Sequence, residues 1–229
     1  MLKIITTLSM VLAAHLAQAQ TQVEAFTKIE AKGDVRIVLK QAQAHSVEFL
    51  EGSGQASADV EKGLLKISAD PGRQAVIEVS APNVASLRAD GSEVTISGGL
   101  SHQKVSMRLS NGASVKGNVA ASKISIAARS GSSVAVRLQA ESFAGRFSGK
   151  SRASLSGKTS FAKLDADGSS LCLARNLISS RAAVRAAGNS DMTVNTLGRI
   201  SISVDETAKI TCIGERTPAA TDTRVVLAH

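Results

Sequence analysis

Short runs in which apolar and polar residues alternate recur through most of the chain, and each run ends near a glycine. Examples are VASLRAD, KVSMRLS, KISIAAR, SFAGRFS, FAKLDAD and RAAVRAA. Alternation with a period of two predicts β-strands that bury one face. The glycines that follow these runs are Gly91, Gly112, Gly131, Gly149, Gly168 and Gly188, spaced by 21, 19, 18, 19 and 20 residues.

A repeat of about 20 residues with strand alternation predicts an all-β fold, a parallel β-solenoid (β-helix) in which each coil stacks on the next. We expect the six glycines to form the corners of the coils, because glycine adopts positive φ without a Cβ penalty. A serine lies two residues after five of them: Ser114, Ser133, Ser151, Ser170 and Ser190. We expect these hydroxyls to form a ladder of hydrogen bonds between neighbouring corners.

Residues 23–83 contain strands of less regular spacing. Residues 23–40 predict two strands around Gly33, and residues 62–69 and 75–80 predict two more. We interpret this part as the first coils and the N-terminal cap of the same domain, since the end strand of a solenoid needs protection. Residues 215–223 are polar and predict a loop, and residues 224–227 (RVVL) are a candidate capping strand.

The first 19 residues have the pattern of a secretory signal peptide. Lys3 precedes an apolar run, and Ala17-Gln18-Ala19 fits a cleavage site. The alternative is a buried helix or an uncleaved anchor. We therefore predict an exported protein with a signal peptide at 1–19, one β-helix domain at 20–214 and a tail at 215–229. No later segment is long and apolar enough to span a membrane as a helix.

The chain has a formal net charge of +8 and contains five Phe but no Trp or Tyr. Val, Ile, Leu and Ala must therefore fill the core, which suits a narrow solenoid. A basic exported protein favours anionic partners such as acidic polysaccharide or lipopolysaccharide. The alternative is that the positive charge serves solubility alone. Nucleic acid is not expected as a partner, because aromatic residues for base stacking are almost absent.

A basic residue occurs about once per coil, shortly before each glycine. If these residues share a face, they form a column with a step of about 5 Å. Like charges on adjacent strands are destabilising, so a polyanion would relieve them. The alternative is a solvated face with interspersed acids. The candidate binding residues are Arg88, Arg108, Arg129, Arg146, Lys163 and Arg185.

Two cysteines, Cys172 and Cys212, lie 40 residues apart, or about two coils. Two coils separate them by nearly 10 Å, and a disulfide needs Cα atoms within about 6.8 Å. We expect both thiols to be free. The four histidines are scattered, and no Cys/His metal pattern is present, so we expect neither a metal nor a cofactor.

The candidates for catalysis are weak. Gly157-Lys158-Thr159 lacks the glycine five residues earlier that a phosphate loop requires, and no histidine accompanies the Gly-x-Ser corners. Asp165 and Asp167 share one face of a strand and could form the carboxylate pair of a glycosidase. Basic residues in the neighbouring coils indicate ion pairing instead. We therefore predict that the protein is not an enzyme and has no catalytic residues.

The sequence also resembles the head GIN domain of the autotransporter-adhesin family, a domain of unknown function. IEVSAPNVASLRADGSEVTISG, the GAS and GSS corners and the closing ITCIGERTP carry the resemblance. Phe26, Ile29 and Gly33 match the opening of the family, whereas Cys212 stands where a tyrosine is common. The resemblance covers almost all of residues 20–229. It implies a right-handed β-helix, export in bacteria and an adhesive role, with no catalytic residues to transfer.

Three functions follow from these observations. The first is an exported, non-enzymatic binding or adhesin-like module, periplasmic or on the cell surface, that recognises an anionic polysaccharide or envelope polymer through a basic β face. The second is a structural or envelope-maintenance protein of the periplasm. The third, ranked last, is a polysaccharide-active enzyme.

Overall fold

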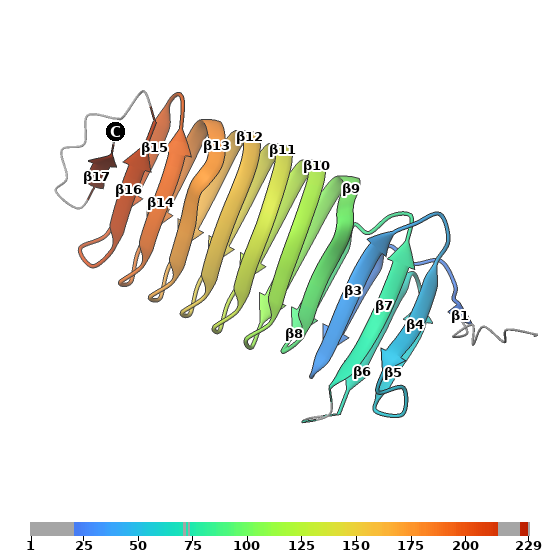
Figure 1. Ribbon diagram of the computed structural model, residues 1–229. Helices are drawn as coiled ribbons and strands as arrows, with labels where there is room; N and C mark the ends of the chain where they lie inside the picture. The colour runs from blue at the N-terminus through green and yellow to red at the C-terminus, as the bar shows by residue number, and fades with distance from the viewer. Residues whose placement is uncertain (1–20, 71, 73, 215–224, 229) are drawn as a thin grey trace, which may run out of the picture.

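The computed structural model describes residues 21–70, 72, 74–214 and 225–228. Within these residues the chain forms 17 strands and no helix (Figure 1). All strands belong to one hydrogen-bonded sheet, which winds into a solenoid of about 7 turns. The expected all-β solenoid is confirmed. The strands are β1 (Thr21–Gln22), β2 (Lys28–Lys32), β3 (Val35–Gln41), β4 (Ser46–Glu51), β5 (Ala56–Glu61), β6 (Leu64–Ala69), β7 (Ala75–Ala81), β8 (Ser86–Asp90), β9 (Glu93–Ser110), β10 (Ser114–Ala128), β11 (Ser133–Phe147), β12 (Arg152–Ala166), β13 (Leu171–Ala186), β14 (Asp191–Thr196), β15 (Ile200–Val204), β16 (Lys209–Ile213) and β17 (Val225–Ala228).

Each coil of the regular part has two walls joined by a glycine corner and by a return bend. β10 pairs with β11 in parallel with an offset of 19 residues, from Ser114↔Ser133 to Ala128↔Phe147. The long strands β9 to β13 bend and contribute to both walls (Figure 1). We call residues 86–90, 104–110, 123–129, 142–148, 161–167 and 181–187 the first wall. We call residues 93–97, 114–118, 133–137, 152–156, 171–176 and 191–195 the second wall.

The N-terminal coils stack in an order that differs from their order along the chain. β2 and β3 pair in parallel with β8 and β9, so they form the coil next to the regular repeat. β6 and β7 pair with the other edges of β2 and β3 and form the next coil outward. β4 and β5 are antiparallel to β7 and β6. The expected irregular N-terminal part is confirmed, and its antiparallel strands cover this end of the solenoid (Figure 1).

The core consists of inward-facing columns, each with one residue per coil. One column on the second wall contains Ile37, Val94, Val115, Val134, Ala153, Cys172, Met192 and Ile210, all buried. Large and small residues compensate along the first wall. Phe147 lies between Ala128 and Ala166 in its column, and a Cβ at Gly145 would come within 2.8 Å of its ring. The coil width therefore stays constant although the side chains differ.

The corners explain why one glycine spacing is shorter than the strand offset of its coil. Five corners contain two consecutive residues with positive φ, as in Asn111-Gly112 and Ser130-Gly131. From Gly149-Lys150 onward, glycine occupies the first of these two positions instead of the second. The spacing between Gly131 and Gly149 is therefore 18 residues, whereas the strands keep their offset of 19.

Because the glycine changes its position in the corner, the serines that form the ladder differ from the predicted ones. Serines 132, 151, 170 and 190 are buried and form the column inside the corners, with Ala113 in the equivalent position of an earlier coil. Ser170 Oγ donates to Asp167 O at 2.6 Å, and Ser151 Oγ donates to Ser170 Oγ at 3.4 Å. Ser114 and Ser133 were predicted for the ladder, and that prediction is wrong. Ser114 and Ser133 each follow the buried corner position by one residue and therefore lie on the outward side of the second wall.

The cysteines occupy inward positions and are free. Cys172 lies on β13 and Cys212 on β16, and β14 pairs with both of these strands. Burial raises the pKa of the Cys172 thiol to about 12 and that of Cys212 to about 11. Both residues therefore act as core residues. The predicted signal peptide at 1–19 and most of the tail at 215–229 lie outside the described residues, and of the tail Val225–Ala228 forms β17, parallel to β16.

Candidate polyanion-binding site

All six basic residues singled out in the sequence lie exposed on the outward side of the first wall. The strand register brings four of them into one column. This column runs through Glu30, Arg88, Arg108, Ala127, Arg146, Asp165 and Arg185. Arg88 and Arg108 are direct neighbours, whereas Ala127 and Asp165 interrupt the sequence of cations.

The other two predicted residues lie in adjacent columns. Lys163 aligns with Ala144 and Ala183, two residues earlier along the strand than the main column. Arg129 lies two residues after the main column, next to the corner. Its backbone N donates to Leu109 O, and Ser148 N donates to Ala128 O, so Ser148 is the residue beside Arg129 in the next coil. The six residues therefore share a face, but the interpretation as a single column is wrong.

Three further cations on the first wall were missed by the sequence analysis. Lys104 and Lys123 are register partners, and Arg181 occupies the same column two coils beyond Ser142. Each lies four residues before the main column on its own strand. Strand alternation places residues four apart on the same face, so the alternation could have found them. The candidate residues named from the sequence were only those nearest each glycine.

The first wall carries a large excess of positive charge. It holds nine exposed cations and three carboxylates. The cations are Arg88, Lys104, Arg108, Lys123, Arg129, Arg146, Lys163, Arg181 and Arg185, and the carboxylates are Asp90, Asp165 and Asp167. Two of the cations form ion pairs within the described part of the chain. Arg146 lies 3.6 Å from Asp165, and Arg88 lies 4.0 Å from Glu30.

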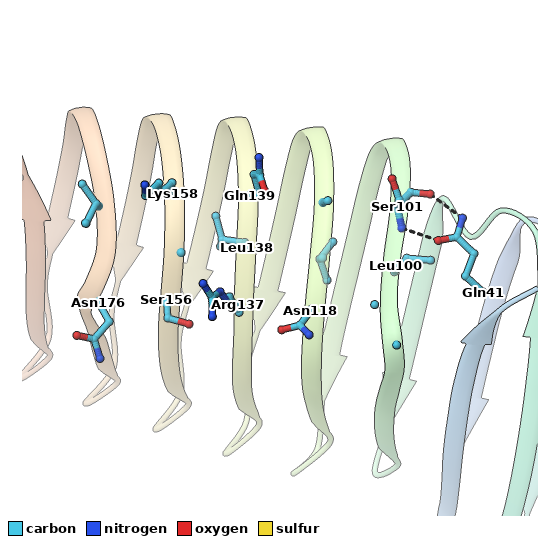
Figure 2. A pocket seen from close by; sticks show the side chains of 16 residues that line it. Gln41, Leu100, Ser101, Asn118, Arg137, Leu138, Gln139, Ser156, Lys158 and Asn176 are labelled. Carbon is cyan, nitrogen blue, oxygen red and sulfur yellow. Dashed lines mark hydrogen bonds between the residues drawn. The ribbon is translucent and has the colours of Figure 1, made fainter.

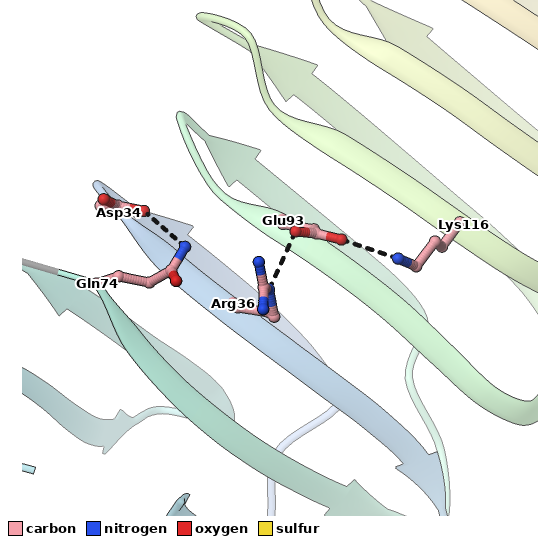
Figure 3. A network of polar contacts seen from close by, with 5 residues as sticks. All are labelled: Asp34, Arg36, Gln74, Glu93 and Lys116. Carbon is pink, nitrogen blue, oxygen red and sulfur yellow. Dashed lines mark hydrogen bonds and ion pairs between the residues drawn. The ribbon is translucent and has the colours of Figure 1, made fainter. Parts of the chain in front are cut away.

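The second wall has fewer charges and a smaller excess of positive charge. It holds four cations (Lys116, Arg137, Arg152 and Arg175) and two carboxylates (Glu93 and Asp191). Figure 3 shows Glu93 between two cations, with Oε1 2.9 Å from Lys116 Nζ and Oε2 3.1 Å from Arg36 Nε. Hydrogen bonding from Lys116, and then from Arg36, holds the pKa of Glu93 below its ordinary value.

The two carboxylates considered as a catalytic pair, Asp165 and Asp167, each contact another group of the protein. Asp165 pairs with Arg146, and Asp167 Oδ1 accepts a hydrogen bond of 2.7 Å from the backbone N of Gly168. Among the residues that the structure describes, no cluster of three or more His, Cys, Asp or Glu side chains could hold a metal ion. The same residues include no helix of the length and hydropathy needed to cross a membrane.

The sequence matches a family model over residues 25–215, described as "putative auto-transporter adhesin, head GIN domain". The chain belongs to this family. The resemblance seen in the sequence is confirmed. No curated protein matches this sequence.

Solved structures share the fold of this GIN domain. A putative adhesin from Parabacteroides merdae is 12% identical, with a TM-score of 0.80, and the match covers 91% of this chain and 92% of that chain. A putative lipid binding protein from Parabacteroides distasonis is 14% identical, with a TM-score of 0.78, and the match covers 91% and 92%. A putative adhesin from Bacteroides fragilis is 18% identical, with a TM-score of 0.60, and the match covers 91% and 90%.

Proposed function

We propose that this GIN domain is an exported, non-enzymatic, adhesin-like module that binds an anionic polysaccharide or envelope polymer on its first wall. The observation that carries the proposal is the arrangement of nine exposed cations over six successive coils. The family description and the names of the structural neighbours support an adhesive role. The neighbour named as a lipid binding protein supports an envelope ligand such as lipopolysaccharide, which also carries anionic groups.

The spacing of the cations suits a polymer better than a small anion. A single exposed ion pair contributes only about 0.2–1 kcal/mol. Adjacent coils are about 4.8 Å apart, which is shorter than the Debye length of about 8 Å at physiological ionic strength. Cations in neighbouring coils therefore act together on a chain of anionic groups. From Arg88 to Arg185 the main column spans five coil steps, or about 24 Å.

The charge pattern also supports binding because its like charges destabilise the protein when no ligand is bound. Arg88 and Arg108 are direct register partners, as are Lys104 and Lys123. Like charges in such positions destabilise a sheet. A bound polyanion would replace this repulsion with attraction, so binding would stabilise the folded protein.

The test is binding of the purified protein to immobilised heparin, lipopolysaccharide and neutral dextran at about 0.05 and 0.5 M salt. We expect binding to at least one anionic polymer at low salt, at least tenfold weaker binding at high salt because the charges are screened, and no binding to dextran. Absence of polyanion binding at low salt would favour a structural periplasmic role. Release of reducing or unsaturated sugar from the polymer would favour an enzyme.

Export is part of the proposal and rests on the pattern at residues 1–19. The test is N-terminal sequencing of the protein recovered from the periplasm and the medium. We expect the chain to begin at Gln20. Recovery of an intact Met1 from the cytoplasm alone would contradict export.

A further inference from the structure

A groove runs along the solenoid where the second wall turns into the return bend (Figure 2). Its volume is about 930 Å³, and five successive coils, from β9 to β13, line it. Adjacent strands are about 4.8 Å apart, so the groove is about 19 Å long. The cations of the first wall do not line it.

Glycines lie at or next to the bend in two of the coils that line this groove. Gly117 and Gly157 have φ values of 138° and 110°. A Cβ at Gly117 would lie 2.6 Å from Ile96 O, and one at Gly157 would clash with Leu138 O. At the level of Gly157, Val119 and Leu138 of the preceding coils turn into the core and are buried. The chain therefore folds inward here, and the outward side chains on either side of the bend flank a concave surface.

Two rows of polar side chains flank the concave surface. The first row is Asn118, Arg137, Ser156 and Asn176, and the second contains Gln139 and Lys158. Figure 2 shows each row at one level of successive coils. In the described part of the chain these six side chains make no hydrogen bond to another protein group, and no carboxylate lines the groove. Their donors and acceptors are available to a ligand.

One end of the groove is closed by Gln41. Its Nε2 donates to Pro82 O at 2.8 Å and to Ser101 O at 3.0 Å, and its Oε1 accepts from Ser101 N at 2.8 Å. The amide of Gln41 is therefore fixed, whereas the two rows beyond it are free.

This chemistry fits an extended glycan that carries carboxylates. Amide side chains present a donor and an acceptor together, which suits sugar hydroxyls. Arg137 can bind a carboxylate with two parallel hydrogen bonds, and Lys158 adds a second charge one coil away. An acidic peptide fits less well, because peptides commonly pair with a free strand edge and β10 to β12 are paired on both sides. The groove also has no aromatic side chain on which a nucleic acid base could stack.

We infer that this groove is a second binding site, distinct from the first wall, which holds a few residues of an extended glycan bearing carboxylate groups. Binding here depends on directed hydrogen bonds to Arg137 and the amide rows as well as on charge. It is therefore less sensitive to salt than binding to the first wall.

The experiment is calorimetric titration of the full chain with a galacturonic acid tetrasaccharide, a neutral maltotetraose and an oligoglutamate at about 0.15 M salt. We expect saturable binding of the tetrasaccharide alone. Arg137→Ala should weaken it about tenfold, because a hydrogen bond to a charged group is lost, and Arg137→Lys should also weaken it because the bidentate geometry is lost. The matched control is Arg152→Ala on the second wall outside the groove, which should bind as the wild type does.

Several outcomes would overturn this inference. One is no binding of the tetrasaccharide, and another is an equal loss from Arg152→Ala and Arg137→Ala. Equal binding of oligoglutamate would assign the groove to acidic peptide instead. Thermal unfolding of each variant separates loss of the site from loss of the fold. Heparin binding by the Arg137→Ala variant separates this inference from the proposed function, because it tests the first wall alone.

Discussion

The two walls of the coil are built from the same strands but carry different chemistry on their outward sides. The first wall has nine cations and three carboxylates, whereas the second has four cations and two carboxylates. On the second wall Glu93 forms ion pairs with Lys116 and with Arg36 of the adjacent N-terminal coil. On the first wall the register partners Arg88 and Arg108 lie side by side.

The difference shows which positions of the repeat are constrained by folding. Inward columns must maintain the coil width, so Phe147 is balanced by Ala128 and Ala166. Outward columns have no such constraint, and charge can accumulate on one wall at the cost of repulsion alone. The corner and the bend also differ in the space around glycine, since a Cβ at Gly157 in the bend would clash with Leu138 O, whereas a Cβ at Gly131 in a corner meets no atom within 4 Å. The predictions below test these contrasts, from the largest expected effect to the smallest.

The largest effect is expected from Gly157→Ala in the bend. The new Cβ would clash with Leu138 O, and the φ of 110° is strained for alanine. We expect a loss of about 3 kcal/mol or more in the free energy of unfolding, measured by urea denaturation. The matched control is Gly131→Ala at a corner, where no atom lies within 4 Å of the new Cβ, with an expected loss of about 1 kcal/mol. Equal losses would mean that the bend is no more constrained than the corner.

A smaller effect is expected from Ser170→Ala in the corner column. This change removes the hydrogen bond from Ser170 Oγ to Asp167 O, and should lower the free energy of unfolding by about 1 kcal/mol. The loss should be no larger, because Ala113 already occupies the equivalent position in another coil. Ser133→Ala, at an exposed position of the second wall, is the matched control and should change the stability little. An equal effect of both changes would show that the buried ladder adds nothing.

The smallest effect is expected from Glu93→Gln on the second wall. The pKa of Glu93 is lowered in the folded protein, so its ion pairs stabilise the fold above the ordinary pKa of 4.5 and lose this effect as the pH falls through the folded value. We expect a loss of less than about 1 kcal/mol at pH 7, which disappears near pH 2. Urea denaturation at the two pH values measures it. A loss that is the same at both pH values would show that the carboxylate charge is not its cause.

The coil itself could be predicted from the sequence because its period and its strand alternation are local patterns. Which outward and corner residues share a column could not be predicted from the sequence. The move of glycine from the second to the first corner position after Gly131 cannot be distinguished from a shorter coil by the spacing alone, and it displaced Ser114 and Ser133 from the predicted ladder. The same dependence on register placed Arg129 and Lys163 outside the main column.

The groove could not be predicted because it depends on contacts between coils. Gly117 and Gly157 matter for their closeness to the backbone of the preceding coil, at Ile96 and Leu138. Their positions in the sequence do not follow the corner repeat. Likewise, the stacking of β6 and β7 outside β2 and β3 results from long-range pairing that no local pattern indicates.

The central claim is that the first wall, and not the overall positive charge, binds anionic polymer. The most direct test compares two double variants that each remove two exposed cations, Arg108→Ser with Arg185→Ser on the first wall and Arg152→Ser with Arg175→Ser on the second. Heparin affinity of both is measured over a range of salt concentrations. We predict that the first-wall variant loses about tenfold or more at low salt and depends less on salt, because two of the four cations of the main column are lost. The second-wall variant should bind nearly as the wild type does, and equal losses from the two variants would contradict the account.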